Sequence, residues 1–258
     1  MIGIFDSGVG GLSIYKACKQ KLPNTSFIYF SDHGHFPYGE KTPDEIKKYA
    51  VKITQFLIQQ GANLVVVACN AATISSIQYL RSIFPIPFVG TEPAVKPASL
   101  ATKTKKIAVL LTNAASAGPA YQELVSKWNN GVQVFSFPLP KLVQIVEENT
   151  LHEKASEQYI LDQINQIRQL GIDTIVLGCT HFIFLKPFLK KYFHDDFTVL
   201  DPTEGVSNQV KRLYDKIPDK KEANQDILFT SGNPAILADF VQTWLKLRIE
   251  VKPVDIYE

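Results

Sequence analysis

Short apolar runs alternate along the chain with longer stretches in which apolar residues recur every three or four positions. Residues 46–57 show this helical spacing, and Thr42, Pro43 and Glu45 in front of them fit a capping box. Continuous apolar runs are typical of parallel strands that are covered on both faces. They fall at residues 2–5, 27–30, 88–90, 107–111, 198–200 and 227–230, and in the stretches that lead to Cys69 and Cys179. This alternation predicts a doubly wound α/β fold.

Two of these runs form a repeat. Residues 61–70 read GANLVVVACN and residues 171–181 read GIDTIVLGCTH, and the two align without a gap, glycine over glycine and cysteine over cysteine. In both halves an earlier strand and a helix precede the cysteine strand, and a helix and a short strand follow it. Two such halves of about a hundred residues indicate duplication, with a pseudo-twofold arrangement. Ligands of parallel sheets bind beyond the carboxyl ends of the strands, so we expect Cys69 and Cys179 to face one cleft between the halves.

The two matched cysteines predict proton-transfer chemistry. A thiolate can accept a proton and a thiol can return one, most effectively when the pKa lies near the working pH. Two thiols on opposite sides of a carbon could therefore invert a stereocentre. A single cysteine in a strand is usually a small buried hydrophobe, and we interpret Cys18, which has no partner in the repeat and lies on an apolar helix face, as a core residue.

Composition narrows the function further. The chain has 258 residues, 45% of them apolar and 20% charged, and a net charge of +2 without a polybasic run. These values favour a globular protein in which neither nucleic acid nor a membrane is the main partner. Three cysteines do not suit a disulfide framework, and neither a leader nor a run of eighteen apolar residues is present, so we expect a cytoplasmic protein.

No motif indicates a cofactor or a metal. The DSGVGG turn at residues 6–11 lacks both the lysine of a phosphate loop and the full spacing of a dinucleotide fingerprint, so a tight turn without a ligand stays an open interpretation. No CxxC or histidine spacing supports zinc. We predict neither a cofactor nor a metal, although a thiol or metal site of Cys69, Cys179 and His181 remains an alternative.

The end of the chain predicts architecture more than chemistry. Residues 227–230 read as a strand, and Asn233 and Pro234 fit the cap and first turn of a helix whose apolar side carries Ile236, Leu237, Phe240 and Trp244. Residues 218–226, PDKKEANQD, predict a charged, exposed connector.

Four segments together resemble the glutamate racemase family of the Asp/Glu racemase superfamily. They are DSGVGGLS at residues 6–13, PYG at 37–39, ACNAAT at 68–73 and LGCTHF at 177–182, in order and at fitting intervals. The resemblance implies a cofactor-independent enzyme that racemises glutamate for peptidoglycan synthesis in a bacterial cytoplasm, and a possible homodimer. It also implies two α/β domains, the first of residues 1–94 plus 206–258 and the second of residues 95–205, with the active site between them.

The resemblance also assigns roles to individual residues. Cys69 and Cys179 would be the acid/base thiols, Asp6 and His181 would assist proton transfer, and Glu147 would be a further acid near the second thiol. The residues that would hold the substrate are Asp6, Ser7, Tyr38, Gly39, Asn70, Ala71, Thr180 and His181. Purely structural roles are the alternative: Asp6 as a helix cap, Asn70 and Thr180 as strand-end caps, His181 as a structural histidine and Glu147 as a solvated helix residue.

The chain departs from the family pattern at several positions. Ala71 stands where the family usually has threonine, which removes a hydroxyl near the substrate, and Ile183 replaces a usual proline. The segments TNAASAGPAY and FPLPKLVQIVEE also differ from the usual pattern. Two further alternatives therefore remain: an aspartate racemase of the same superfamily, and a non-catalytic relative that binds an acidic amino acid.

Overall fold

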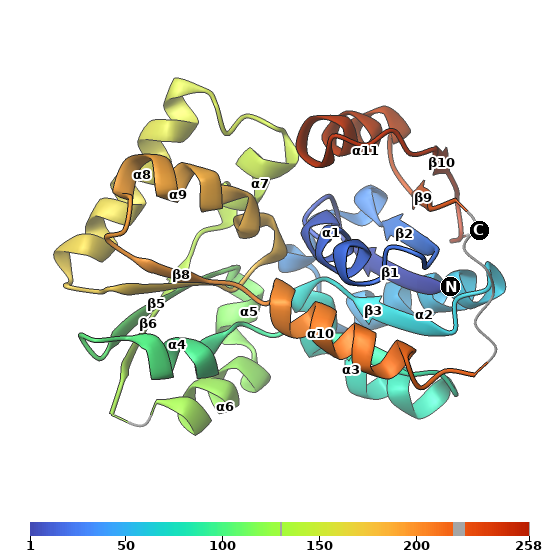
Figure 1. Cartoon of the computed structure of the whole chain (residues 1–258), viewed down its shortest axis with the longest axis horizontal. Coiled ribbons are helices and arrows are strands. Elements are labelled where there is room, and N and C mark those ends of the chain that lie inside the picture. The colour runs from blue at the N-terminus through green and yellow to red at the C-terminus, as the bar shows by residue number, and fades with distance from the viewer. Residues whose placement is uncertain (130, 219–224, 258) are drawn as a thin grey trace. The chain divides into compact units, whose positions relative to one another are not determined.

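The chain folds into two compact units, and each contains one parallel sheet between helices (Figure 1). The computed structural model describes residues 1–129, 131–218 and 225–257. The first unit comprises Met1–Thr91 and Thr203–Glu258, and the second comprises Glu92–Pro202. The first unit is therefore assembled from both ends of the chain. The domain boundaries inferred from the sequence, after residues 94 and 205, stay a prediction.

The sheet of the first unit has six strands in the order β10-β9-β2-β1-β3-β4. All neighbouring strands are parallel. β1, β2 and β3 are buried along their whole length because helices cover both faces, which explains their continuous apolar sequence. The strands are β1 (Ile2–Asp6), β2 (Phe27–Ser31), β3 (Leu64–Val67), β4 (Phe88–Gly90), β9 (Ile227–Thr230) and β10 (Val251–Pro253).

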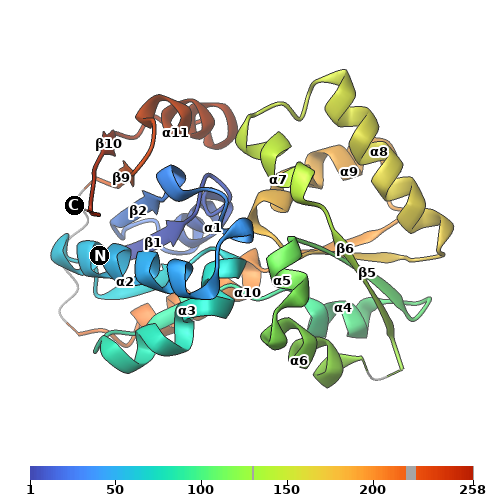
Figure 2. The same ribbon diagram turned by 180° about the vertical axis from the view of Figure 1, so that it is seen from behind.

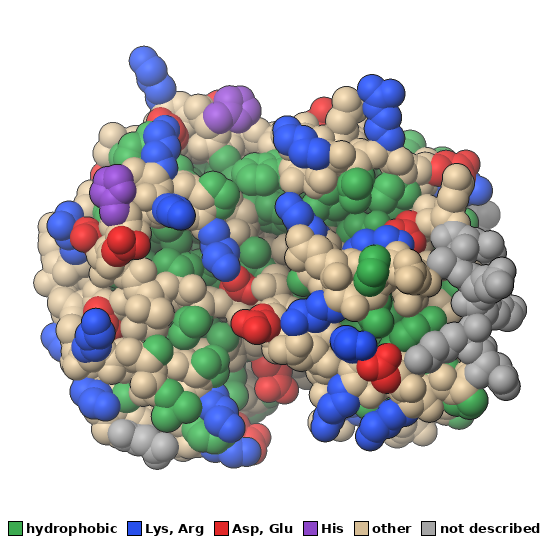
Figure 3. Space-filling model, viewed as in Figure 1, with side chains coloured by type: hydrophobic (Ala, Val, Ile, Leu, Met, Phe, Trp, Pro, Cys, Tyr) green, Lys and Arg blue, Asp and Glu red, His purple; other side chains and the backbone are tan. Residues whose placement is uncertain are grey.

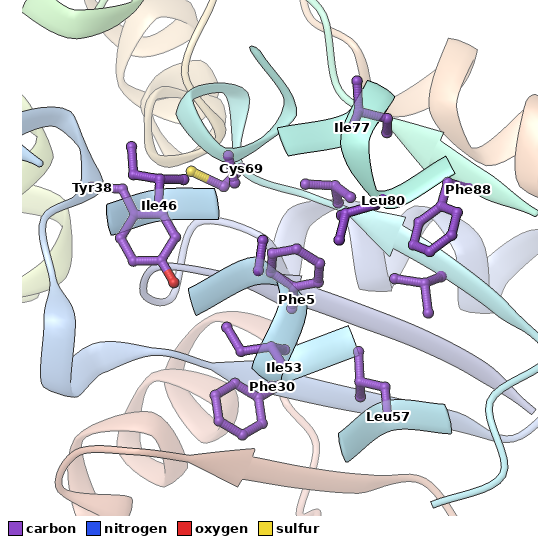
Figure 4. Packing of buried hydrophobic residues seen from close by; sticks show 14 of the residues in the cluster. Phe5, Phe30, Tyr38, Ile46, Ile53, Leu57, Cys69, Ile77, Leu80 and Phe88 are labelled. Atoms are coloured by element: carbon purple, nitrogen blue, oxygen red, sulfur yellow. The ribbon is translucent and has the colours of Figure 1, made fainter. Parts of the chain in front are cut away.

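Two pairs of helices cover the two faces of this sheet. α2 (Pro43–Gln59) and α3 (Asn70–Ile83) pack on the face that carries Phe5 and Phe30, in one hydrophobic cluster (Figure 4). α1 (Leu12–Lys21) and α10 (Thr203–Tyr214) contact each other, and Tyr15 of α1 packs edge-on against Phe27, 5.7 Å between ring centroids. Phe27 and Phe30 point to opposite faces because side chains alternate along a strand.

The second unit has a four-stranded parallel sheet in the order β6-β5-β7-β8. Its strands are β5 (Lys106–Leu111), β6 (Gln133–Pro138), β7 (Thr174–Leu177) and β8 (Thr198–Leu200). Both views show α4 and α6 on one side of this sheet and α8 and α9 on the other (Figures 1 and 2). The helices are α4 (Val95–Ala101), α5 (Asn113–Ala117), α6 (Pro119–Trp128), α7 (Pro140–Glu147), α8 (Lys154–Gln169) and α9 (Lys186–Phe193).

The sheet topologies confirm the predicted α/β fold and show the internal repeat. The order β2-β1-β3-β4 in the first unit corresponds to β6-β5-β7-β8 in the second, so each cysteine follows the third strand of an equivalent sheet. The repeated glycines have a backbone reason: Gly61 has φ +96° after α2, and Gly171 has φ +71° after α8. This left-handed conformation ends a helix at little cost only for a residue without a Cβ.

Local predictions at helix starts are confirmed. Thr42 forms the predicted capping box with Glu45 at the start of α2, and Asn233 caps α11 (Pro234–Phe240) through the amide of Ala235. Side chains at the predicted helical spacing in α2 are buried, namely Ile46, Ala50, Ile53 and Leu57.

The polar segment after β2 contains two short 3-10 helices, η1 (His33–His35) and η2 (Tyr38–Glu40). Two local expectations need correction. Ile236, expected on the apolar side of α11, is 39% exposed, because the buried side of that short helix is formed by Leu237 and Phe240. Asp226, expected in an exposed connector, forms an ion pair with Lys19 at 3.0 Å. The rest of the predicted connector includes residues 219–224, which lie outside the described residues.

The surface mixes both signs of charge. On the face shown in Figure 3, Lys and Arg side chains are interspersed with Asp and Glu, in keeping with the small net charge of +2. None of the helices in the described part of the chain has the length and the apolar character that a membrane span requires.

Candidate active site

The carboxyl ends of the strands collect the polar residues of the first unit. Asp6 is the last residue of β1, Asp32 follows β2, Thr91 follows β4, and Cys69 lies two residues beyond β3. Parallel strands end at one edge of a sheet, so residues far apart in sequence come together there. All four are at least nine-tenths buried.

Cys69 contacts the turn that follows β1. Its Sγ lies 3.9 Å from the Ser7 hydroxyl oxygen, within the range of a hydrogen bond from sulfur. The carboxylate of Asp6 accepts hydrogen bonds from the Ser7 amide at 2.7 Å and from the Ser7 hydroxyl at 3.3 Å. Thiol, hydroxyl and carboxylate therefore form a connected polar chain. Gly11 allows the turn to pack closely, since a Cβ there would lie 2.8 Å from the Asp6 Cβ.

Asn70 begins α3 beside the first thiol. Its amide nitrogen donates to the Thr91 carbonyl at 3.3 Å, which fixes the side chain. Its Oδ1 is buried and has no hydrogen-bond partner among the described residues. A buried amide oxygen without a donor costs roughly 1–3 kcal/mol, so this atom suits a ligand that supplies an N–H group.

Tyr38 packs near Cys69 but directs its hydroxyl elsewhere. Tyr38, Cys69 and Ala71 belong to one buried cluster. In Figure 4 the hydroxyl of Tyr38 points away from the Cys69 sulfur, and it donates to the Asp32 carboxylate at 2.5 Å. Gly39 follows Tyr38 in η2 and is half-buried. The structure thus brings Asp6, Ser7, Tyr38, Asn70 and Ala71 into the neighbourhood of Cys69, with the Tyr38 phenol committed to Asp32.

Cys179 is positioned by the equivalent strand of the second unit. It follows β7 after Gly178, whose amide donates to the Leu110 carbonyl at 2.7 Å. A Cβ at Gly178 would lie 2.8 Å from that same carbonyl oxygen. Close approach of the two backbones therefore requires glycine here, although Ala68 occupies the equivalent position before Cys69 and its amide donates to the Phe5 carbonyl at 2.8 Å.

A buried acid and a histidine serve the second thiol. Cys179 Sγ lies 3.9 Å from His181 Nδ1, and His181 Nε2 lies 2.6 Å from Glu147 Oε2. Glu147 comes from the end of α7 and His181 from η3 (Thr180–Leu185), and both are at most 5% exposed. The structure therefore places Glu147 in the core of this unit, where the alternative interpretation had a solvated helix residue.

The charge of His181 is set by its neighbours. Burial alone would lower its pKa, but the hydrogen bonds and negative charges of Cys179 and Glu147 outweigh it and raise the pKa of His181 well above the usual value. The imidazole can then carry a proton at neutral pH and exchange it with the thiol. Thr180, between Cys179 and His181, is 1% exposed and starts η3.

The third cysteine is placed differently. Cys18 lies on α1 and is fully buried, and burial raises the pKa of its thiol to about 12. A thiol of that kind is inert at neutral pH. In the described part of the chain, no three His, Cys, Asp or Glu side chains are grouped so that they could hold a metal ion.

Sequence reasoning missed Asp32 and Thr91 at this edge of the first sheet. Asp32 is fully buried and accepts from Tyr38, and Thr91 accepts from Asn70 through its carbonyl. Both directly follow the last residue of a strand. A polar residue at that place in a parallel sheet was the available signal.

Comparison with known proteins assigns this arrangement to a family. A model of the Asp/Glu/Hydantoin racemase family matches residues 2–209. The chain belongs to the Asp/Glu/Hydantoin racemase family. It is therefore an amino-acid racemase, an isomerase. A glutamate racemase of Pseudomonas putida is 38% identical to it over 239 residues, which cover 92% of this chain and 90% of the relative.

Solved structures of this racemase family share the fold over nearly the whole length. Glutamate racemase of Escherichia coli, in complex with L-glutamate and the activator UDP-MurNAc-ala, superposes with a TM-score of 0.89 at 29% identity and covers 98% of this chain and 96% of its own. Glutamate racemase of Francisella tularensis, in complex with D-glutamate, gives a TM-score of 0.83 at 27% identity, covering 99% and 97%. The two-unit α/β architecture is thus that of the family.

Proposed function

We propose that this chain racemises glutamate, with Cys69 and Cys179 as the two acid/base groups. The observation that carries the proposal is that both thiols follow equivalent strands and that each has its own polar partners, Ser7 and Asp6 for one and His181 and Glu147 for the other. The similar proteins suggest the substrate, since they are glutamate racemases.

The proposed reaction moves two protons. One cysteine, as thiolate, takes the Cα proton and leaves the electron pair on Cα; the other, as thiol, gives a proton to the opposite face and becomes the thiolate. The stereocentre is inverted, and the two cysteines have exchanged protonation states. This route requires both units to present their thiols to one Cα atom, at opposite faces.

The partners of each thiol have a defined task in this scheme. A second turnover in the same direction requires the thiol to lose its new proton and the thiolate to regain one. His181, held by Glu147, can take or return a proton at Cys179 Sγ, and the Ser7 hydroxyl with Asp6 can do so at Cys69 Sγ. Because these groups are buried, their electrostatic effect on the reacting carbon is weakly screened.

The substrate ammonium and carboxylates need partners of opposite kind. The free Oδ1 of Asn70 is a suitable acceptor for the ammonium group. The remaining positions around the substrate carboxylates are proposed to be lined by Ser7, Thr180, Tyr38, Gly39 and Ala71. We propose that the reaction uses no cofactor, that its product D-glutamate serves peptidoglycan synthesis in a bacterial cytoplasm, and that a homodimer forms; these remain predictions.

The direct test follows optical rotation of L-glutamate and of D-glutamate with purified protein under reducing conditions. Wild-type protein is expected to bring each to zero rotation, whereas Cys69→Ser and Cys179→Ser should each slow this by roughly 10²- to 10⁴-fold, since a hydroxyl is a far weaker acid than a thiol. Cys18→Ala, at the inert third thiol, is the control. Wild-type rates in either serine variant would exclude the two-thiol route.

Two outcomes would redirect the proposal. Loss of rotation with L-aspartate and not with L-glutamate would assign the aspartate specificity left open by Ala71. Calorimetric binding of glutamate without any loss of rotation would assign a binding protein.

A further inference from the structure

A second buried carboxylate, outside the proposed proton-transfer groups, lies at the same edge of the first sheet. Asp32 is fully buried. Its Oδ2 accepts from the Tyr38 hydroxyl at 2.5 Å, and its Oδ1 accepts from the Ser231 hydroxyl at 2.7 Å and contacts His35 Nδ1 at 3.0 Å. A carboxylate with this many donors is a fixed point to which several segments are tied.

The main chain of Asp32 connects this fixed point to the first thiol site. Its amide donates to the carbonyl of Asp6 at 2.9 Å, and its own carbonyl accepts from the His35 amide at 3.0 Å. Asp32 therefore touches Asp6 through the backbone and Tyr38 through the side chain. Tyr38 packs in one cluster with Cys69, and Asp6 accepts a hydrogen bond from the Ser7 hydroxyl that contacts the Cys69 sulfur.

The Tyr38 phenol is available only for this contact. Tyr38 is 1% exposed, and burial together with the negative charge of Asp32 raises the pKa of Tyr38 well above its usual value, so the hydroxyl stays protonated and donates. Figure 4 shows that this hydroxyl is directed away from Cys69. A direct bond from the phenol to a substrate at Cys69 would require the Asp32 bond to break.

We propose that Asp32 is a positioning residue, which acts through the Tyr38 hydroxyl to hold residues 33–41 against Cys69 and the start of α3. The proposal deepens the proposed racemisation and rests on it for its kinetic consequences. It assigns the Tyr38 side chain to anchoring, and leaves the backbone of Tyr38 and Gly39 to face the substrate. The Asp32 bond thus sets how well the segment is ordered before the substrate arrives.

The chain offers a matched control at the opposite edge of the same sheet. Asp226 precedes β9, and its carboxylate accepts from the buried Tyr15 hydroxyl at 2.7 Å and from the Phe27 amide at 2.9 Å. This is again a phenol bound to an aspartate, but at the amino ends of the strands. Tyr15→Phe therefore removes the same kind of hydrogen bond without touching residues 33–41.

The first measurement needs no substrate. Hydrogen–deuterium exchange of the amides in residues 33–41 is expected to be about tenfold faster in Tyr38→Phe than in wild type, and unchanged in Tyr15→Phe. Each variant loses one oxygen atom and keeps the ring, so both should fold. Unchanged exchange in Tyr38→Phe, or an equal increase in both variants, would overturn the positioning role.

The second measurement is a double-mutant cycle in racemase kinetics. Asp32→Asn and Tyr38→Phe should each lower kcat/KM for glutamate by about tenfold, mainly through KM, because a loosened segment binds substrate less well. The double variant should be no worse than Asp32→Asn alone, since the charge-assisted hydrogen bond from Tyr38 is already weakened in that variant. Tyr15→Phe should leave KM unchanged. If the falls in kcat/KM of the two single variants multiply in the double variant, Asp32 does not act through Tyr38.

The two measurements separate failure of this inference from failure of the proposed function. Wild-type protein that does not racemise glutamate, with faster exchange in Tyr38→Phe, would reject the function and keep the anchoring role. Wild-type racemisation with unchanged exchange and unchanged KM in the variants would reject only the role of Asp32.

Discussion

Cys69 and Cys179 follow equivalent strands of two sheets with the same order, yet the groups around them differ. Cys69 contacts a hydroxyl that is held by a carboxylate, whereas Cys179 contacts an imidazole that is held by a carboxylate. The repeated backbone determines where each thiol lies, and side chains from non-equivalent positions determine its chemistry. Asp6 ends β1 and Ser7 follows it in the turn, but Glu147 comes from α7, after β6.

This difference explains how a duplicated backbone can support a reaction in which one thiol removes a proton and the other returns one. The backbone bonds that place the thiols are conserved between the units: the Ala68 amide donates to Phe5 and the Gly178 amide donates to Leu110. The side chains around each thiol are free to diverge, because they do not take part in the strand ladder. Three experiments test how far this contrast extends.

The largest expected effect comes from removing one proton partner at a time. His181→Asn and Asp6→Asn should each lower kcat/KM by roughly 10²- to 10³-fold, because neither asparagine can exchange a proton. The two glutamate enantiomers have equal energy, so kcat/KM must fall equally in both directions. The directional information lies in isotope effects.

Isotope effects should be mirror images in these two variants. In His181→Asn, the kinetic isotope effect from Cα-deuterated substrate should rise for one enantiomer, because proton removal from Cα is the slowed step in that direction. The solvent isotope effect should rise for the other enantiomer, because proton return to Cα is the slowed step in the reverse direction. Asp6→Asn should show the opposite assignment. The same pattern in both variants would contradict separate partners for the two thiols.

A smaller effect is expected on stability, at the second thiol only. Glu147→Gln should lower the free energy of unfolding by on the order of 2–3 kcal/mol at pH 6, because it breaks a buried pair. Glu147 raises the pKa of His181 in the folded chain. The stabilisation is therefore complete below the pKa of histidine in the unfolded chain, about 6.5, and is lost as pH rises through the raised pKa of His181 in the folded chain.

Urea unfolding between pH 6 and pH 9.5 measures this dependence. The difference in free energy of unfolding between wild type and Glu147→Gln should become smaller as pH rises. Glu148→Gln, at the exposed neighbouring residue, should show no such trend. A difference that widens with pH would mean that His181 is not stabilised as a cation.

The smallest expected effect concerns the backbone before each thiol. Gly178→Ala should lower the free energy of unfolding by about 1–3 kcal/mol, because the new Cβ would lie 2.8 Å from the Leu110 carbonyl oxygen. Ala68→Gly, at the equivalent position, should cost about 1 kcal/mol through backbone entropy and a lost buried methyl. Thermal unfolding of both variants compares them. A neutral Gly178→Ala would show that the two units are more alike here than their packing indicates.

Much of the fold could be predicted from the sequence because its signals are local. Helical spacing, the Thr42 capping box and the glycines at positive φ each involve only a few neighbouring residues. The alternation of strands and helices then limits the fold to a parallel sheet in each half. Ile236 and Asp226 were predicted wrongly because their exposure depends on packing with distant segments.

The candidate site was predictable only in part, for the same reason. The cysteines could be paired by the repeat, and the family resemblance named their neighbours. Asp32 was missed, since its partner Ser231 is 199 residues away and no local pattern connects them. The sequence also could not show that the Tyr38 hydroxyl donates to Asp32, because this bond depends on the direction in which the buried Tyr38 side chain points.

The sequence by itself determined most of the alternation of strands and helices, the place of each thiol just beyond a buried strand, and the glycines that end α2 and α8, but it did not predict β6 or β10. Only the tertiary structure decided which groups meet each thiol. Ser7 reaches Cys69 from 62 residues away, and Glu147 reaches His181 from 34 residues away. Such contacts follow from the order of strands in a sheet and the packing of helices on it, which no local pattern of residues encodes.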